Sequence, residues 1–185
     1  MIKLGIVIPT FNRSAYLKRL LGQIIKFKSD EFEYVIIIVN DGSKDETSDI
    51  LDKFISFNQD MYKIQGTGEW WWTRSFNTGM TECFLKHGTQ YVLSLNDDIE
   101  ISESFFFDLK KIISELNNLY NDYFMFNCGA VDIKTGQYCD LGVLKDLKNT
   151  FLEKKITVNE FRNNAKYTKL NHVHGSGLVV PDSLL

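Results

Sequence analysis

Three apolar runs in this chain each end abruptly in a polar segment, and this pattern constrains the fold more than any other feature. The runs occupy residues 4–8, 35–39 and 91–95, and the second consists only of valine and isoleucine. They lack the alternation of a half-buried strand, which is typical of strands covered on both faces, as in parallel sheets. Parallel strands end at one edge, where open sheets bind ligands. We therefore expect the polar segments to meet there.

Segments with helical periodicity separate these runs, so strands and helices alternate. Ser43 and Glu46 have the spacing of a capping box, and Ser102 is a candidate N-cap for a later helix. The pattern predicts strands at 3–8, 34–39, 62–65 and 91–95, and helices at 14–27, 45–58, 74–87 and 103–119.

The last third of the chain has a mixed character. Residues 123–131 and 137–144 have the composition of strands, and the segment Lys134-Thr135-Gly136 between them indicates a turn. Two further short strands are expected within residues 170–180. The whole pattern predicts an α/β fold of Rossmann-like type, with three layers (α/β/α) around a mostly parallel central sheet.

Composition narrows the class of protein. With 185 residues, of which 44% are hydrophobic, the chain can bury one sizeable core, and we expect a single domain. A net charge of -3 without a basic cluster gives no reason to expect nucleic-acid binding. The three cysteines are widely spaced and include no Cys-x-x-Cys pair, so we expect neither disulfides nor a zinc site, and a reducing compartment. No apolar run approaches the roughly 20 residues that span a bilayer.

Two acidic segments follow the second and third apolar runs. Asp97 and Asp98 come directly after residues 91–95, and Asp41 follows residues 35–39. Adjacent carboxylates repel, so such a pair either separates its proton affinities or recruits a divalent cation through hard oxygen ligands. Helix-capping aspartates in a solvated loop are the simpler interpretation of an isolated pair, but here several polar segments share one sheet edge.

A cluster of aromatic residues precedes the third helix. Trp70, Trp71 and Trp72 are consecutive and are the only tryptophans of the chain. One face of a regular element cannot bury all three indoles, so we expect some ring surface to line a pocket, where sugars or bases can stack. Core packing is the alternative for each single ring.

The polar motifs together resemble glycosyltransferase family 2, whose members have the GT-A fold. The resemblance rests on the segments 9–13 (PTFNR), 39–47 (VNDGSKDET) and 95–98 (LNDD), in this order and spacing. The run Trp70-Trp71-Trp72-Thr73, followed by Asn77-x-Gly79, is similar to a subgroup that includes rhamnosyltransferases. The resemblance covers nearly the whole chain, although each motif alone is weak.

The resemblance implies a transferase that moves a sugar from a UDP- or dTDP-activated donor to a saccharide or other hydroxyl acceptor, free or lipid-linked, in the synthesis of cell-surface polysaccharide. It also implies inverting, metal-dependent chemistry with Mn²⁺ or Mg²⁺, and a cytoplasmic location that includes the inner face of the membrane. Residues 1–98 would bind the donor and residues 99–185 the acceptor, within one GT-A domain.

The resemblance also assigns residues to roles. Asp98 would hold the metal, with Asp97 on the ribose side. Asp41 would accept the N3–H of a uracil or thymine ring, which a carboxylate does more strongly than a neutral group. Arg74 could assist the phosphates. The expected donor-binding residues are Pro9, Thr10, Asn12, Arg13, Asp41, Trp72, Thr73, Asn77 and Asp97, and the expected acceptor-side residues are Trp71, His174 and Gly175.

Two departures from the family pattern leave alternatives open. Asn96 stands where many members carry Asp, so the metal would depend on Asp98 together with phosphate oxygens and water. No residue matches the family's general base, so the catalytic residue is unknown and we expect the chain to be truncated at its carboxyl end. A catalytically inert nucleotide- or carbohydrate-binding fragment is therefore one alternative. A nucleotidyltransferase is another, although residues 9–13 contain no glycine to cradle a triphosphate.

Overall fold

The structure is a computed structural model that describes residues 1–140, 143–145, 153–155 and 177–184. The chain forms two compact units, one of residues 1–125 with 180–185 and one of residues 126–179. The predicted site residues His174 and Gly175 lie outside the described residues, as does the first of the two strands expected within 170–180.

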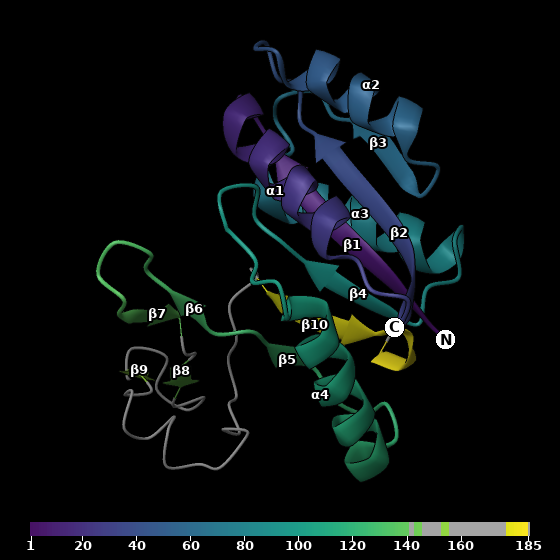
Figure 1. Cartoon of the computed structure of the whole chain (residues 1–185), viewed down its shortest axis with the longest axis vertical. Helices are drawn as coiled ribbons and strands as arrows, with labels where there is room; N and C mark the ends of the chain where they lie inside the picture. The colour runs from purple at the N-terminus through teal and green to yellow at the C-terminus, as the bar shows by residue number, and fades with distance from the viewer. Residues whose placement is uncertain (141–142, 146–152, 156–176, 185) are drawn as a thin grey trace. The chain divides into compact units, whose positions relative to one another are not determined.

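The first unit is built on four parallel strands (Figure 1). They are β1 (Ile2–Thr10), β2 (Phe32–Asn40), β3 (Met61–Gln65) and β4 (Tyr91–Ser94), and their order in the sheet is β3-β2-β1-β4. The sheet continues with β10 (Leu178–Pro181) and β5 (Phe126–Asn127), and these last two strands pair antiparallel. The prediction of an α/β fold with a mostly parallel central sheet is confirmed.

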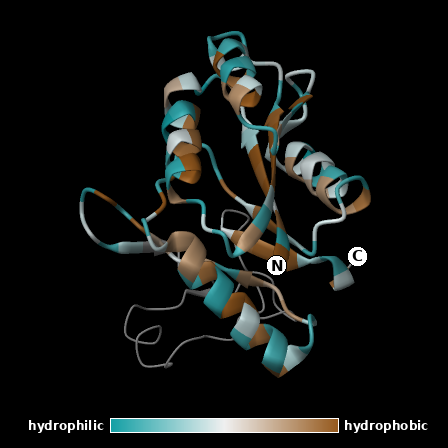
Figure 2. Ribbon diagram, turned by 45° about the vertical axis from the view of Figure 1, so that its right-hand side comes forward, coloured by the Kyte–Doolittle hydropathy of each residue, from teal (hydrophilic) through white to brown (hydrophobic). Residues whose placement is uncertain are grey.

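Four helices accompany the sheet. They are α1 (Ser14–Phe27), α2 (Thr47–Phe57), α3 (Trp71–Leu85) and α4 (Phe105–Tyr120). Hydropathy colouring shows largely brown, hydrophobic strands and helices in which teal, white and brown residues are mixed, as amphipathic helices require (Figure 2). None of the helices in the described part of the chain combines the length and the apolarity that a membrane crossing requires.

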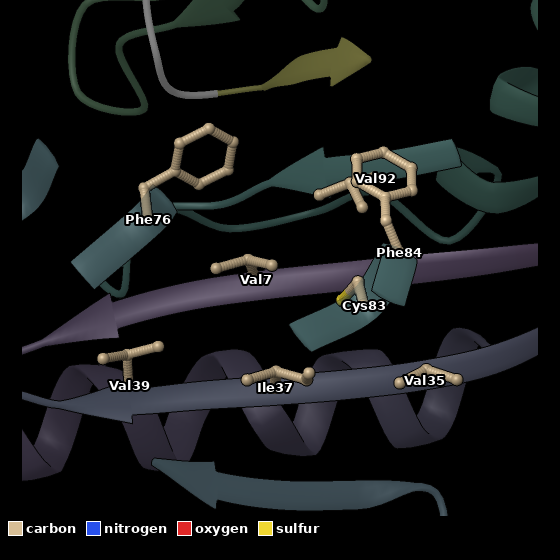
Figure 3. Packing of buried hydrophobic residues seen from close by; sticks show 8 residues of the cluster. All are labelled: Val7, Val35, Ile37, Val39, Phe76, Cys83, Phe84 and Val92. Carbon is tan, nitrogen blue, oxygen red and sulfur yellow. The ribbon is translucent and has the colours of Figure 1, made fainter. Parts of the chain in front are cut away.

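Alternate residues of the strands face different helices, as the pleat of a strand requires. Val7, Ile37 and Val39 belong to a cluster that also contains Phe76 and Cys83 of α3 (Figure 3). Residues of the opposite parity point to the other face, where Tyr34 of β2 meets Phe106 of α4 edge to face, with ring centroids 5.2 Å apart. Both faces of the strands are therefore buried, which explains why their sequences do not alternate.

Two predicted helix caps are wrong. Ser43 does not cap a helix, because its Oγ accepts a hydrogen bond from the backbone N–H of Asn12 at 2.9 Å, and α2 begins only at Thr47. Asp45 binds the Thr47 N–H instead, through Oδ1 at 3.1 Å. Ser102 is not the N-cap of α4, which begins at Phe105 with Ser104 before it.

The second unit contains short strands where longer ones were predicted. Segment 123–131 contains only β5 and β6 (Ala130–Val131), and segment 137–144 divides into β7 (Tyr138–Asp140) and the start of β8 (Val143–Lys145). The predicted turn between them is confirmed, because β6 and β7 pair antiparallel around it. Strand β8 pairs with β9 (Glu153–Lys155). The short 3-10 helix η1 (Asp182–Leu184), which follows β10, belongs to the first unit.

Candidate functional site

A pocket of about 380 Å³ opens at the carboxyl ends of β1, β2 and β4. The strand order reverses between β1 and β4, and this is the position at which open α/β sheets bind their ligands. Every lining residue belongs to the first unit. The lining residues are Pro9, Thr10, Phe11, Arg13, Asp41, Gly68, Trp71, Trp72, Ser75, Asn96, Asp97 and Asp98.

The acidic pair and the loop after β1 form one hydrogen-bonded network at this pocket. The buried Asp97 accepts a hydrogen bond from Thr10 Oγ1 at 2.7 Å on its Oδ2. Its Oδ1 accepts one from Arg13 Nη1 at 3.1 Å, and the same nitrogen lies 2.7 Å from Asp98 Oδ2. Arg13 therefore bridges the two carboxylates and offsets part of their mutual repulsion.

Burial and charge oppose each other at Asp97. Burial raises the pKa of its carboxyl above the ordinary value, while the hydrogen bond from Thr10 and the positive charge of Arg13 lower it. In return, the carboxylate of Asp97 raises the pKa of Arg13. The half-exposed Asp98 faces solvent on the same side of the pocket. The pair thus offers one carboxylate held inside the protein and one accessible to a ligand.

These residues fit a divalent cation only with help from a ligand. The described part of the chain contains no cluster of three His, Cys, Asp or Glu side chains that could hold a metal ion. Asp97 already accepts hydrogen bonds from two side chains. The amide oxygen of Asn96 accepts a hydrogen bond from Trp72 Nε1 at 3.0 Å. A hard cation prefers about six oxygen ligands, so Asp98 would need phosphate oxygens and water to complete the shell.

The carboxylate of Asp41 organises the loop before α3. Its Oδ1 accepts the N–H of Gly68 at 2.8 Å, and its Oδ2 accepts the N–H groups of Trp70 and Trp71, each at 2.9 Å. Gly66 lies so close that a Cβ there would sit 2.6 Å from Oδ1. Asp41 is buried, and it satisfies amides that a helix start would otherwise leave without partners.

This carboxylate explains why α3 begins at Trp71, three residues before the predicted start at 74. The N-cap residue Trp70 makes no side-chain capping bond, and the cap comes instead from Asp41, directly after β2. Trp71 has a left-handed backbone with φ +54°, which costs a non-glycine residue about 1–2 kcal/mol. Its side chain is 81% exposed at the pocket. Strain and exposure in one residue are typical of functional positions.

The other two tryptophans have different surroundings. Trp72 stacks on Phe76, with ring centroids 5.1 Å apart, and its N–H holds Asn96 beside the acidic pair. Trp70 packs against the core cluster, and the guanidinium of Arg74 lies 4.8 Å from the centre of its ring. The prediction that the three indoles cannot all be buried is confirmed.

Three predicted donor-binding residues do not line the pocket. Asn12 instead joins two loops, because its Oδ1 accepts the N–H of Lys44 at 2.7 Å. Thr73 and Asn77 are exposed residues of α3 outside the lining. Four residues line the pocket but were not among the expected binding residues: Phe11, Gly68, Ser75 and Asn96. Helical spacing carried the signal for Ser75, since it lies one turn after Trp71.

Comparison with known proteins gives a family match. The model of the family described as Glycosyl transferase family 2 matches residues 5–180. A poly(ribitol-phosphate) beta-N-acetylglucosaminyltransferase, TarS of Staphylococcus aureus, is 32% identical over 54 residues, which are 29% of this chain and 9% of that protein. The uncharacterized glycosyltransferase MG060 of Mycoplasma genitalium is 31% identical over 52 residues, 28% of this chain and 18% of that one.

Solved structures share the fold. S. aureus TarS 1-349 in complex with UDP-GlcNAc has a TM-score of 0.53 at 22% identity, over 62% of this chain and 32% of that one. The mannosyltransferase PcManGT of Pyrobaculum calidifontis, in complex with GDP-Man and Mn2+, has a TM-score of 0.56 at 15% identity, over 71% and 36%. The chain thus spans well under two thirds of the length of these relatives.

Proposed function

This chain belongs to glycosyl transferase family 2, and from that premise we propose that its pocket binds a nucleotide-sugar donor for transfer to a hydroxyl acceptor. The observation that supports this most is the joining of Thr10, Arg13, Asp97 and Asp98 into one polar network at the reversal point of the sheet. The acceptor would be a saccharide, free or lipid-linked, in the synthesis of a cell-surface polymer.

The donor would carry a pyrimidine base, as UDP- or dTDP-sugars do. Asp41 Oδ1 accepts a single backbone N–H, so a lone pair is left for the N3–H of uracil or thymine. The exposed rings of Phe11 and Trp71 line the same pocket and offer faces for stacking. GDP-Man in the PcManGT complex shows that the fold also accepts purine donors, so the base must be tested directly.

The diphosphate would lie at the acidic end of the pocket. Arg13 is the pocket's cationic side chain, and it could turn from Asp98 to the phosphates while Asp97 keeps it in place. A divalent cation held by Asp98 and the diphosphate would neutralise the charge that develops on the leaving group. An inverting transfer also needs a general base for the acceptor hydroxyl, and we assign no residue to that role.

Thermal shift with UDP, dTDP, ADP and GDP, each with and without Mn²⁺, tests the proposal. UDP and dTDP should stabilise the chain most, by about 2.7 kcal/mol at a hundredfold excess over Kd. Asp98→Ala should abolish the additional shift due to Mn²⁺ and leave the metal-free shift in place. Equal shifts with all four nucleotides would overturn the pyrimidine assignment, and the absence of any shift would overturn donor binding.

A further inference from the structure

We infer that Arg19 of α1 is a positioning residue for the candidate metal ligand Asp98, which it holds through the backbone and not through the carboxylate. The inference rests on the proposed function and extends it to a residue outside the pocket, which neither the sequence motifs nor the pocket lining identifies. It begins from the loop that carries the acidic pair and from the helix side chains that this loop contacts.

The loop of residues 95–104, which joins β4 to α4, is held by side chains of α1. The guanidinium of Arg19 donates through Nη2 to the backbone carbonyl of Asp98 at 3.3 Å, and its Nη1 lies 2.8 Å from Glu100 Oε1. Farther along the loop, the backbone N–H of Ile101 donates to Gln23 Oε1 at 3.1 Å. Arg19 and Gln23 are four residues apart and share one face of the helix. Two successive turns of α1 therefore hold the loop.

Helix α1 is a rigid support for these contacts. The residues of its inner face have no exposed surface: Leu17, Leu20, Leu21 and Ile24. Side chains carried by a packed helix hold a site more precisely than a loop can do alone. Arg19 therefore transmits the fixed position of the helix to the loop that carries the acidic pair.

The guanidinium of Arg19 is itself held on several sides. Besides the Asp98 carbonyl and the Glu100 carboxylate, it contacts the ring of Tyr16, whose centre lies 5.5 Å from the guanidinium carbon. This distance is typical of a cation–π contact. Arginine presents its donors in a planar fork, so one side chain can bind two acceptors together, whereas lysine carries all its donors on one nitrogen. The position therefore favours arginine over lysine.

Arg19 and Arg13 contact Asp98 in different ways. Arg13 binds Oδ2 of the carboxylate, an atom that a cation would also use. Arg19 binds the backbone carbonyl, so its contact does not compete with a metal for the carboxylate. The carbonyl carbon and the side chain are attached to the same Cα, and a fixed carbonyl therefore restricts where the carboxylate can point. Arg19 thus orients the ligand without occupying it.

Electrostatics and positioning predict opposite effects for the removal of Arg19. A cation near a metal site repels the metal, so the loss of its charge alone would strengthen Mn²⁺ binding. The loss of a positioning contact would weaken it, and residues that orient metal ligands commonly contribute about 10- to 100-fold to metal affinity. The sign of the change therefore distinguishes the two roles.

The test measures Mn²⁺ binding by calorimetry to the chain saturated with UDP, for wild type and for the double variant Arg19→Gln/Glu100→Gln. This variant removes the ion pair without changing the net charge. We expect it to bind Mn²⁺ about tenfold more weakly than wild type. Its affinity for UDP without metal should stay within about twofold, since neither residue lines the pocket.

The double variant Lys3→Gln/Glu33→Gln is the matched control. Lys3 and Glu33 form an ion pair at 2.9 Å between β1 and β2, at the amino ends of these strands and away from the pocket. Its loss should leave Mn²⁺ binding unchanged. Each double variant loses one surface ion pair, so both should unfold within about 4 °C of wild type.

Two single variants separate charge from geometry. Arg19→Gln should weaken Mn²⁺ binding to the UDP complex, although it removes a positive charge from the vicinity of the metal. Arg19→Lys keeps that charge but cannot present the planar fork, so it should give a Mn²⁺ affinity between those of Arg19→Gln and wild type.

The contrary results are distinguishable from one another. Unchanged or tighter Mn²⁺ binding in Arg19→Gln/Glu100→Gln would overturn the inference and leave the proposed function standing. An equal loss of metal-free UDP affinity would also overturn it, because the variant would then disturb the pocket as a whole. If the wild-type UDP complex does not bind Mn²⁺, the proposed metal role of Asp98 fails, and the inference fails with it.

Discussion

At the scale of a single residue, Asp41 supports the fold through three backbone amides, and the proposed function gives the same carboxylate a role in binding the base. Asp41→Asn replaces one of its oxygens by an NH₂ group that must face backbone N–H donors. We expect the free energy of unfolding to fall by about 1.5–3 kcal/mol, the range for hydrogen bonds to a charged group. Urea denaturation measures this loss. The preference for UDP over ADP and GDP should weaken in the same variant.

Asp52→Asn is the matched control for this prediction. Asp52 is an exposed aspartate of α2 that pairs with Lys63, and such surface ion pairs contribute about 0–1 kcal/mol. A loss in Asp41→Asn no larger than that in Asp52→Asn would contradict a structural role for the three amide contacts.

Arg13 opposes the effect of burial on the protonation of Asp97. Burial already raises the pKa of Asp97, and the charge of Arg13 opposes that shift. Arg13→Gln should therefore raise the Asp97 pKa further, as carboxyl-detected NMR titration would show. A raised folded-state pKa favours the protonated fold, so stability is lost as pH rises from the unfolded value through the folded one. This loss should extend to higher pH in the variant than in wild type.

Arg19→Gln provides the comparison. Arg19 pairs with Glu100 at 2.8 Å. Its contact with the acidic pair is a hydrogen bond to the backbone carbonyl of Asp98, so its removal should leave the Asp97 titration almost unchanged. If both arginine variants shift the Asp97 pKa equally, the effect comes from general charge and not from the bridge that Arg13 forms.

The contact between α3 and the sheet makes a prediction at the scale of elements. Gly79→Ala would place a methyl group 2.5 Å from Val7, in a core that cannot expand, and should destabilise the chain by about 1–3 kcal/mol. Gly22→Ala on α1 meets nothing within 4 Å and should stabilise it by about 0.5–1 kcal/mol, because alanine favours the helix. Thermal denaturation distinguishes the opposite signs, and equal effects would contradict this packing.

Local sequence predicted most elements of the first unit. Helix α1 has the predicted bounds, 14–27, because its apolar spacing and the preceding polar loop are both local signals. The start of α3 could not be predicted in the same way, since Asp41 caps it from thirty residues earlier in the chain. The bounds of short strands such as β5 and β6 could not be predicted either, because strands of two residues show no periodicity.

The sequence predicted those site residues that lie at the ends of predicted strands. Thr10, Arg13, Asp41, Asp97 and Asp98 all follow or end apolar runs, and the parallel sheet brings them to one pocket. Ser75 was missed because its place at the pocket depends on where α3 begins, and Asp41 fixes that start from a distant part of the chain.

At the scale of the whole molecule, metal and nucleotide should bind as one linked event. Asp98 alone offers too few oxygens, so Mn²⁺ should bind weakly to the free chain and much more tightly with UDP present. Linkage requires Mn²⁺ to tighten UDP binding by the same factor. Calorimetry in both orders of addition measures the two factors. Tight Mn²⁺ binding without nucleotide, unaffected by Asp98→Ala, would contradict this.

Every residue that lines the pocket lies between Pro9 and Asp98, in one uninterrupted stretch of the chain. A gene segment that encodes this stretch can therefore be inherited or exchanged as a block without dividing the pocket. Substitutions and insertions after residue 125 would alter other parts of the protein and leave these lining residues untouched. Lineages can thus diversify the rest of the protein while the lining of this pocket stays the same.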